Sequence, residues 1–321
     1  MELSFIGLGA MGVPMLDHLV RDEATVSHIY VHNRTRARCE EWVASLPGEE
    51  LRARVTICDS PAAALEAQAV GPLAPFRIVC SIVSNDAALD EVCSSLGAVL
   101  APQDIHLCLS TVSPEIMDKQ AALSLEKGAY FVACPVFGRP PVVVARKLFS
   151  VPSGDASAVD RCRPILQVFS QKIVYGGAKC SNSAILKLSG NFCILSFIQM
   201  SAEYLALAES HGIDRSVAYE LLSSPSGVFA NLPILATYGK LVEQQQYTPV
   251  GFSALNGLKD AGLICDAAAA GGVEGAVIMG AVRERLERVC REDPSGGREV
   301  DWASFADLVT VKGQGQGQGQ G

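Results

Sequence analysis

The stretch Gly7-Leu8-Gly9-Ala10-Met11-Gly12 fits the spacing G-x-G-x-x-G. It follows an apolar run at 3–7 and opens a helical pattern at 11–21, and this strand–turn–helix context is the one in which such a turn binds a dinucleotide. Gly7 allows the tight turn, Gly9 lets the backbone approach a pyrophosphate, and Gly12 lets the helix pack closely on the strand. The unpaired amides at the helix start favour the anion. We therefore predict that a dinucleotide contacts Gly7, Gly9, Ala10, Met11 and Gly12; a plain glycine-rich turn is the alternative.

The end of the second predicted strand favours NADP over NAD. An acidic residue normally lies about 20 positions after the turn and binds the ribose 2′-hydroxyl of NAD. Here the strand ends in Asn33, Arg34 and Thr35, with no carboxylate. A guanidinium can hold a 2′-phosphate through two parallel hydrogen bonds. We predict NADP contacts from these three residues, although the arginines could instead be solvated charges at a helix start.

Strand and helix patterns alternate through the first half of the chain, which predicts an α/β fold with a doubly wound parallel sheet, a Rossmann domain. The strands are nearly continuous apolar runs, as expected when helices cover both faces. Val83, at the end of one run, is a further predicted cofactor contact. The predicted strands are 3–7, 28–32, 54–58, 77–83, 105–110, 130–134, 147–151 and 172–175, with helices that include 11–21, 35–46, 87–100 and 114–127.

The second half shows only helical patterns, at about 181–211, 214–223, 233–246, 253–270 and 275–291. Gly176-Gly177 interrupts the alternation, so we place a Rossmann domain at 1–175 and an all-α substrate and dimerisation domain at 176–311. The Gly/Gln tail at 312–321 has no apolar residue to offset the entropy of ordering and should be disordered.

Bulk composition excludes several classes of protein. The 321 residues carry a formal net charge of −8, which argues against nucleic-acid binding. The 11 cysteines form no C-x-x-C pair, so we predict no metal site and expect reduced thiols in a cytoplasmic protein. The apolar stretch 184–208 contains Lys187, Asn191, Gln199 and Glu203, which would be costly in lipid; we expect a buried helix rather than a membrane span.

Lys187 and Asn191 lie four residues apart in this stretch and therefore share one helical face. Apolar neighbours desolvate a lysine and can lower its pKa, which suits it to proton transfer. Asn191 offers both a donor and an acceptor to a substrate. A lysine on a helix more often extends to water, so the pattern alone does not decide its role.

At this point the chain resembles the β-hydroxyacid dehydrogenase family, whose N-terminal domain is similar to that of 6-phosphogluconate dehydrogenase. The resemblance extends to about residue 291. It rests on the motif at 7–15, which matches G-x-G-x-M-G-x-P-M, on Ser110-Thr111-Val112-Ser113-Pro114, on the loop at 134–139, on Lys187 with Asn191, and on Phe252 followed by Lys259-Asp260.

The resemblance implies roles for these positions. Lys187 and Asn191 would be the catalytic pair, and Thr111 would lie by the nicotinamide and the substrate. Phe252 and Lys259 would contact the cofactor and Asp260 the substrate. Phe137, Gly138 and Arg139 would bind the substrate, but Phe137 replaces a serine and Arg139 a glycine of the family pattern. A site without that serine hydroxyl can accept a larger or less polar carbonyl compound.

We therefore expect an NADP-dependent oxidoreductase, acting on a small β-hydroxyacid or semialdehyde in a cleft between two domains, with Lys187 as general acid and base. A homodimer through the helical domains is expected because the helix at 184–208 is more apolar than one small domain can cover. Two alternatives stay open. One is an imine reductase or reductive aminase of the same layout, and the other is a cofactor-binding module without catalysis.

Overall fold

The computed structural model describes residues 1–69, 75–229, 231–274 and 277–310. The chain forms two compact units, Met1–Lys187 and Leu188–Gly321, so their division falls inside one long helix, α9 (Ser181–Ser210). The sequence analysis placed a domain boundary at 175–176, ahead of this helix. The predicted tail at 312–321 lies outside the described residues.

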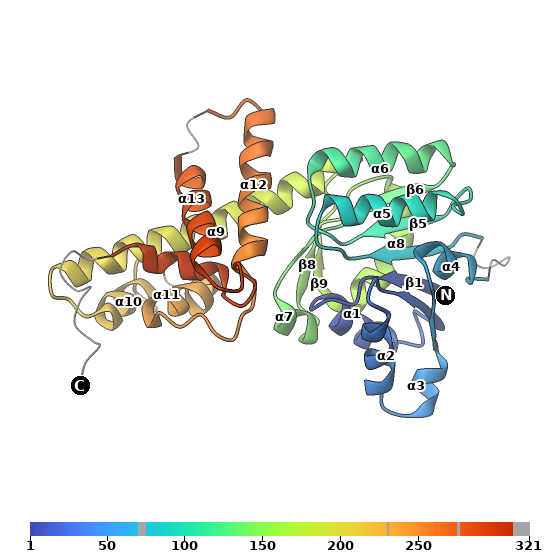
Figure 1. Cartoon of the computed structure of the whole chain (residues 1–321), viewed down its shortest axis with the longest axis horizontal. Coiled ribbons are helices and arrows are strands. Elements are labelled where there is room, and N and C mark those ends of the chain that lie inside the picture. Colours follow the sequence, from blue (N-terminus) through green and yellow to red (C-terminus); the bar gives the residue numbers. More distant parts are fainter. Residues whose placement is uncertain (70–74, 230, 275–276, 311–321) are drawn as a thin grey trace. The chain divides into compact units, whose positions relative to one another are not determined.

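The first unit is built on a parallel sheet, whose six strands lie within the described part of the chain in the order β3-β2-β1-β4-β5-β6 (Figure 1). This order is that of the doubly wound dinucleotide-binding fold, which reverses direction between β1 and β4. The predicted Rossmann fold is thus confirmed. The strands are β1 (Glu2–Ile6), β2 (His28–His32), β3 (Val55–Ile57), β4 (Ile78–Ser81), β5 (Ile105–Cys108) and β6 (Tyr130–Ala133).

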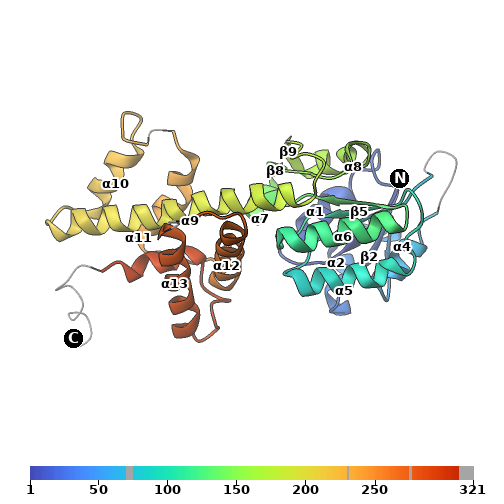
Figure 2. The ribbon, with the colours of Figure 1, turned by 90° about the horizontal axis from the view of Figure 1, so that it is seen from above.

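Helices cover both faces of this sheet, which is why the central strands β4 and β5 are buried along their whole length. One face packs against α1 (Gly12–Leu19), α2 (Arg36–Ser45) and α8 (Ala156–Phe169). The other packs against α4 (Pro61–Glu66), α5 (Asp86–Gly97) and α6 (Pro114–Glu126); Figure 2 shows α5 and α6 together on a side away from α8. The short helix α3 (Glu49–Ala53) precedes β3.

The last three strands of the first unit form a separate small sheet, in the order β7-β8-β9. β7 (Val136–Phe137) pairs antiparallel with β8 (Leu148–Ser150), and β9 (Ser170–Ile173) pairs parallel with β8. A five-residue helix, α7 (Pro140–Val144), links β7 to β8. The sequence analysis assigned neither β7 nor α8, because β7 is very short and α8 contains Pro164, a residue that normally breaks a helical pattern.

The second unit is helical in its described residues. The residues of α9 after Leu188 pack there against α12 (Ala254–Ala270) and α13 (Val277–Glu292). Predicted helix 233–246 is a π-helical turn, η1 (Leu235–Gly239), followed by α11 (Lys240–Gln244). The other elements are α10 (Arg215–Ser223) and a 3₁₀ helix, η2 (Trp302–Leu308), which was not predicted.

By length and composition α9 could cross a membrane, and it is the one described helix that could. Leu195, Ile198 and Leu205 are nevertheless fully buried in the core of the second unit. Lys187 and Asn191 in the same helix would be costly in lipid. We therefore interpret α9 as a core helix.

Candidate cofactor and proton-transfer site

The glycine turn is fixed by close backbone contacts. Gly7 has φ +103° and its amide donates to the His32 carbonyl oxygen at 3.0 Å. A Cβ on Gly7 would lie 2.1 Å from the carbonyl oxygen of Ile82, and one on Gly12 would lie 2.2 Å from that of Gly7. A Cβ on Gly9 would meet no atom within 4 Å. Gly7 and Gly12 are therefore required by the fold, whereas Gly9 faces open space.

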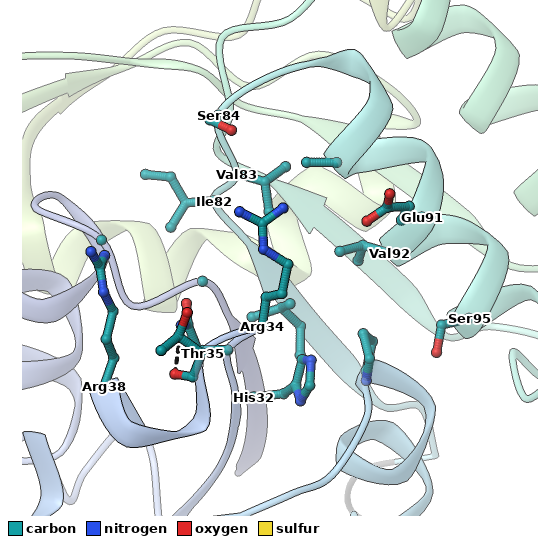
Figure 3. A pocket seen from close by; sticks show the side chains of 16 residues that line it. His32, Arg34, Thr35, Arg38, Ile82, Val83, Ser84, Glu91, Val92 and Ser95 are labelled. Atoms are coloured by element: carbon teal, nitrogen blue, oxygen red, sulfur yellow. Dashed lines mark hydrogen bonds between the residues drawn. The ribbon is translucent and has the colours of Figure 1, made fainter. Parts of the chain in front are cut away.

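That open space is a cavity of about 390 Å³ at the carboxyl edge of the sheet (Figure 3). The cavity is lined by six of the residues expected to contact a cofactor, Gly7, Gly9, Asn33, Arg34, Thr35 and Val83, and also by His32, Arg38, Ser84 and Glu91. Three predicted contacts of the glycine turn are not among the lining residues. Ala10 is exposed outside the cavity, and Met11 packs partly against the core. Gly12 serves the packing of α1 rather than the cavity wall.

Asn33 joins the two loops that form the cavity floor. Its Oδ1 accepts a hydrogen bond from the Leu8 amide at 2.9 Å, and its Nδ2 donates to the Thr35 carbonyl oxygen at 2.9 Å. The glycine turn is thereby held against the end of β2. An aspartate here could accept the first bond but could not donate the second, so Asn33 fits this position by its amide as well as by its lack of charge.

Three arginines surround the start of α2, and they differ in what they contact. Arg36 forms ion pairs with Glu40 at 3.0 Å and with Asp59 at 2.5 Å. Arg34 and Arg38 line the cavity, and neither forms an ion pair with any residue in the described ranges. In Figure 3 the two side chains extend in the same direction. The sequence analysis missed Arg38, which lies in the first turn of α2, whereas Arg34 precedes that helix.

The turns after β4 and β5 bring Val83 and Thr111 to the same edge of the sheet. The Val83 amide donates to Ser110 Oγ at 2.8 Å. Ser113 caps α6, because its Oγ accepts from the Ile116 amide at 3.2 Å. Thr111, between the two serines, is half-buried. Ser110 and Ser113 of the motif therefore have structural roles, in holding the turn after β4 and in capping α6.

A buried histidine on β5, His106, lies between the side chains of Ser81 and Cys93. His106 Nε2 lies 2.7 Å from Ser81 Oγ, and His106 Nδ1 lies 3.6 Å from Cys93 Sγ. Burial lowers the pKa of His106 to about 3, so the imidazole is neutral. The same burial raises the pKa of the Cys93 thiol. These groups are structural partners at neutral pH rather than a nucleophile and its base.

Lys187 lies in the second turn of α9, and its side chain contacts the predicted substrate loop. Only 9% of Lys187 is exposed. Its Nζ lies 4.2 Å from the centroid of the Phe137 ring. The start of the helix is tied to the first unit, since the Ser181 amide donates to Asp118 Oδ1 at 2.9 Å and Ser183 Oγ donates to the Ala133 carbonyl oxygen at 3.2 Å. Lys187 and Phe137 therefore belong to one unit.

The rest of the predicted substrate loop is shaped by its backbone. Gly138 has φ +142°, and a Cβ there would lie 2.5 Å from Leu148 Cδ2. Arg139 is the half-buried residue that precedes α7. Gly138 is exposed. A side chain at position 138 would disturb the loop, so Gly138 agrees with the glycine of the family pattern. At position 139 the family pattern has a second glycine, which Arg139 replaces.

In the second unit, Asp260 connects two of the predicted site residues. Asn191 Nδ2 donates to Asp260 Oδ2 at 2.6 Å, and Lys259 Nζ lies 2.9 Å from Asp260 Oδ1. Asp260 is fully buried. Phe252 packs against Trp302 with ring centroids 4.7 Å apart. This arrangement suits Asp260 to orienting Asn191 and Lys259 rather than to touching a ligand itself.

The first unit is a dinucleotide-binding domain of the Rossmann class. This follows from its strand order and from its cavity at the switch point between β1 and β4. A family model for the NAD binding domain of 6-phosphogluconate dehydrogenase matches residues 2–177. The chain belongs to the β-hydroxyacid dehydrogenase family. It is an oxidoreductase with a nicotinamide cofactor.

Individual relatives and solved structures are consistent with this family assignment. The chain is 30% identical to the uncharacterized oxidoreductase YfjR of Bacillus subtilis over 271 residues, which cover 84% of this chain and 87% of the relative. It is 26% identical to glyoxylate/succinic semialdehyde reductase 1 of Arabidopsis thaliana, over 96% and 98% of the two chains. The fold is similar to that of 3-hydroxyisobutyrate dehydrogenase from Mycobacterium tuberculosis, with a TM-score of 0.79, 22% identity, and 96% and 99% of the chains covered.

Proposed function

We propose that the protein is an NADP-dependent oxidoreductase that reduces a small semialdehyde-type carbonyl compound, or oxidises the matching β-hydroxyacid, with Lys187 as the proton-transferring residue. The observation that carries this proposal is a lysine, 9% exposed, in the same unit as an open dinucleotide pocket. A nearly buried amine can titrate closer to neutrality than one in water, which proton transfer requires.

The cofactor would bind with its pyrophosphate at Gly9, where no side chain intervenes, and at the start of α1. When bound, its nicotinamide supplies or accepts a hydride at the substrate carbon. Lys187 donates a proton to the substrate oxygen in reduction and accepts it in oxidation. Asn191, oriented by Asp260, would hold the substrate or the lysine. Thr111, Gly138 and Arg139 would position the rest of the substrate.

The preference for NADP rests on Arg34 and Arg38. Both line the pocket at the end of β2, where a 2′-phosphate would lie, and neither has an ionic partner among the described residues. Two guanidinium groups on one dianion are worth more than one, because each can donate two parallel hydrogen bonds. Glu91 also lines the pocket, but it lies on α5 rather than at the end of β2, where NAD-specific proteins carry their acid.

The substrate is proposed as a carbonyl compound with an apolar group near its reacting carbon. Phe137 lies beside Lys187, at the place where the family pattern has a serine. A phenyl ring cannot donate a hydrogen bond to a carboxylate, but it can pack against an apolar group. An imine reductase would share this layout; Lys187 favours the carbonyl substrate because protonating an alkoxide needs a group that can deliver a proton.

We further propose a cytoplasmic homodimer. Leu207, Val217 and Leu221, on α9 and α10, are each more than half exposed. An apolar surface of this kind is normally covered by a partner, and two-fold homodimers are the commonest solution. All eleven cysteines lie in the described ranges and are free thiols, which fits a reducing compartment.

One assay tests the proposed activity. Purified protein is mixed with NADPH or NADH and a panel of semialdehydes, glyoxylate and cyclic imines, and oxidation of the cofactor is followed by absorbance. We expect NADPH-dependent reduction of at least one aldehyde. Turnover of imines alone would replace the proposal with an imine reductase. Tight NADPH binding with no turnover of any compound would identify a module without catalysis.

A further inference from the structure

The ring of Phe137 covers the ammonium group of Lys187. The Nζ atom lies 4.2 Å from the ring centroid, within the distance at which a cation is attracted to the face of an aromatic ring. Phe137 is half-buried and Lys187 is 9% exposed. Because little water reaches this contact, the attraction is weakened less by solvent than at an open surface.

The small sheet holds the ring in this position. Phe137 is the second residue of β7 and lies opposite Phe149 on β8. The two rings meet edge to face, with centroids 6.1 Å apart and planes at 75°, which is a favoured aromatic geometry. Gly138 and the start of α7 follow directly. The ring therefore has little freedom to move away from Lys187.

Resting on the proposed role of Lys187 as the proton-transferring residue, we propose that Phe137 is a positioning residue that holds this lysine in its protonated form. A ring face attracts the ammonium ion and not the neutral amine, so it opposes the loss of the proton that burial favours. The protonated form is the one that can donate to the oxygen of a carbonyl compound. Phe137 thus adapts the site to the reduction direction.

The proton balance of that step is simple. A bound cofactor would supply a hydride to the carbonyl carbon while the C=O π electrons move to oxygen, and the Nζ–H bond of Lys187 would break to form the new O–H bond. The products are the alcohol and the oxidised cofactor, and the neutral amine regains its proton from water. Besides packing against the substrate, Phe137 affects this proton transfer through the fraction of Lys187 that is protonated at the start and through the position of the Lys187 Nζ atom.

Two variants test the proposal. Phe137→Leu keeps an apolar side chain and removes the ring face, and Phe137→Tyr keeps the ring. Labelling of Lys187 by a small acylating reagent, followed by mass spectrometry across a pH series, reports the neutral amine without any need for turnover. We expect half-maximal labelling to move about half a pH unit lower in Phe137→Leu and to stay unchanged in Phe137→Tyr. Equal profiles for parent and Phe137→Leu would overturn the proposal.

The pH dependence of carbonyl reduction is the second readout. In Phe137→Leu the high-pH limb of kcat/KM should move lower by the same amount, while Phe137→Tyr keeps the limb of the parent. A shift in labelling without a shift in this limb would overturn the role of Phe137 in the reaction. If Phe137→Leu does not fold, Phe137→Met takes its place. If the parent reduces no compound, the proposed function fails, and the labelling series still decides whether Phe137 holds the ammonium ion.

Discussion

Asn191 and Asp260 are 69 positions apart in the chain, yet Asn191 Nδ2 donates to Asp260 Oδ2 at 2.6 Å inside the second unit. The bond fixes which face of the amide group remains for other contacts. It also gives the buried carboxylate a second partner in addition to Lys259 Nζ, at 2.9 Å. Both helices that carry predicted site residues in this unit, α9 and α12, are thus joined through one acidic side chain.

Replacing this carboxylate should weaken the second unit. In Asp260→Ala, Lys259 and Asn191 lose their partner, and removal of one member of a buried polar set costs about 1–3 kcal/mol. Lys259 is 28% exposed, which keeps the cost below that of a fully buried pair. Urea unfolding measures the change, with Asp266→Ala, an exposed position on the same helix, as control. Equal stability of the two variants would contradict the structural role of Asp260.

Lys187→Ala should lower the rate of carbonyl reduction by at least about 10²-fold, the low end for a general acid or base. NADPH binding should not change, because the pocket residues are untouched. Steady-state kinetics and fluorescence titration with NADPH measure the two effects. Lys179→Ala removes a lysine that is 68% exposed and paired with Asp118, and it should retain parental turnover. Full turnover in Lys187→Ala would rule out the proposed proton transfer.

Arg34→Ala and Arg38→Ala should each weaken NADPH binding, by about 10-fold or more for the loss of a charge-assisted contact of 1.5–3 kcal/mol. NADH binding should change little, since it lacks the 2′-phosphate. Arg36→Ala is the matched control, because Arg36 pairs with Glu40 and Asp59. Titration calorimetry with both cofactors gives the comparison. An equal loss for NADPH and NADH would show that the arginines bind some other group.

Substitution of Gly9 should weaken cofactor binding without affecting folding, whereas substitution of Gly7 should destabilise the fold. Gly9→Ala places a methyl group where nothing lies within 4 Å, so thermal stability should stay within about 0.5 kcal/mol while cofactor affinity falls. Gly7→Ala meets a carbonyl oxygen at 2.1 Å and needs φ +103°, which should cost at least about 1–3 kcal/mol. Calorimetric melting and NADPH titration measure both. Normal cofactor affinity in Gly9→Ala would place the pyrophosphate elsewhere.

Acid should destabilise the first unit through His106. Its pKa is about 3 in the folded protein and about 6.5 in an unfolded chain, so the unfolded state binds more protons between these values. The contribution of neutral His106 to the free energy of unfolding is complete above pH 6.5. It is lost as the pH falls, by up to about 1.4 kcal/mol per pH unit. His106→Gln should flatten the dependence between pH 6.5 and 4.5, whereas the exposed His211→Gln should not. Urea unfolding at several pH values distinguishes the two.

The strands and helices with strong patterns were predictable because each carries its signal locally. The apolar runs of β1, β4 and β5, the glycine turn and the helical spacing of α12 all follow from side-chain periodicity over a few residues. β7 and α8 gave no such signal, the first because it has two residues and the second because Pro164 lies inside it. That the last strands form a second sheet could not be predicted either, since strand pairing depends on contacts distant in sequence.

The sequence by itself determined the Rossmann fold, the place of the cofactor turn and the candidate lysine, because these depend on spacing along one segment. The tertiary structure decided which of three neighbouring arginines face the pocket, which residue covers Lys187, and that Asp260 is a buried connector. These relationships join residues that are far apart in sequence or differ only by a rotation about a helix axis. No local pattern encodes them, since they arise only when the segments pack together.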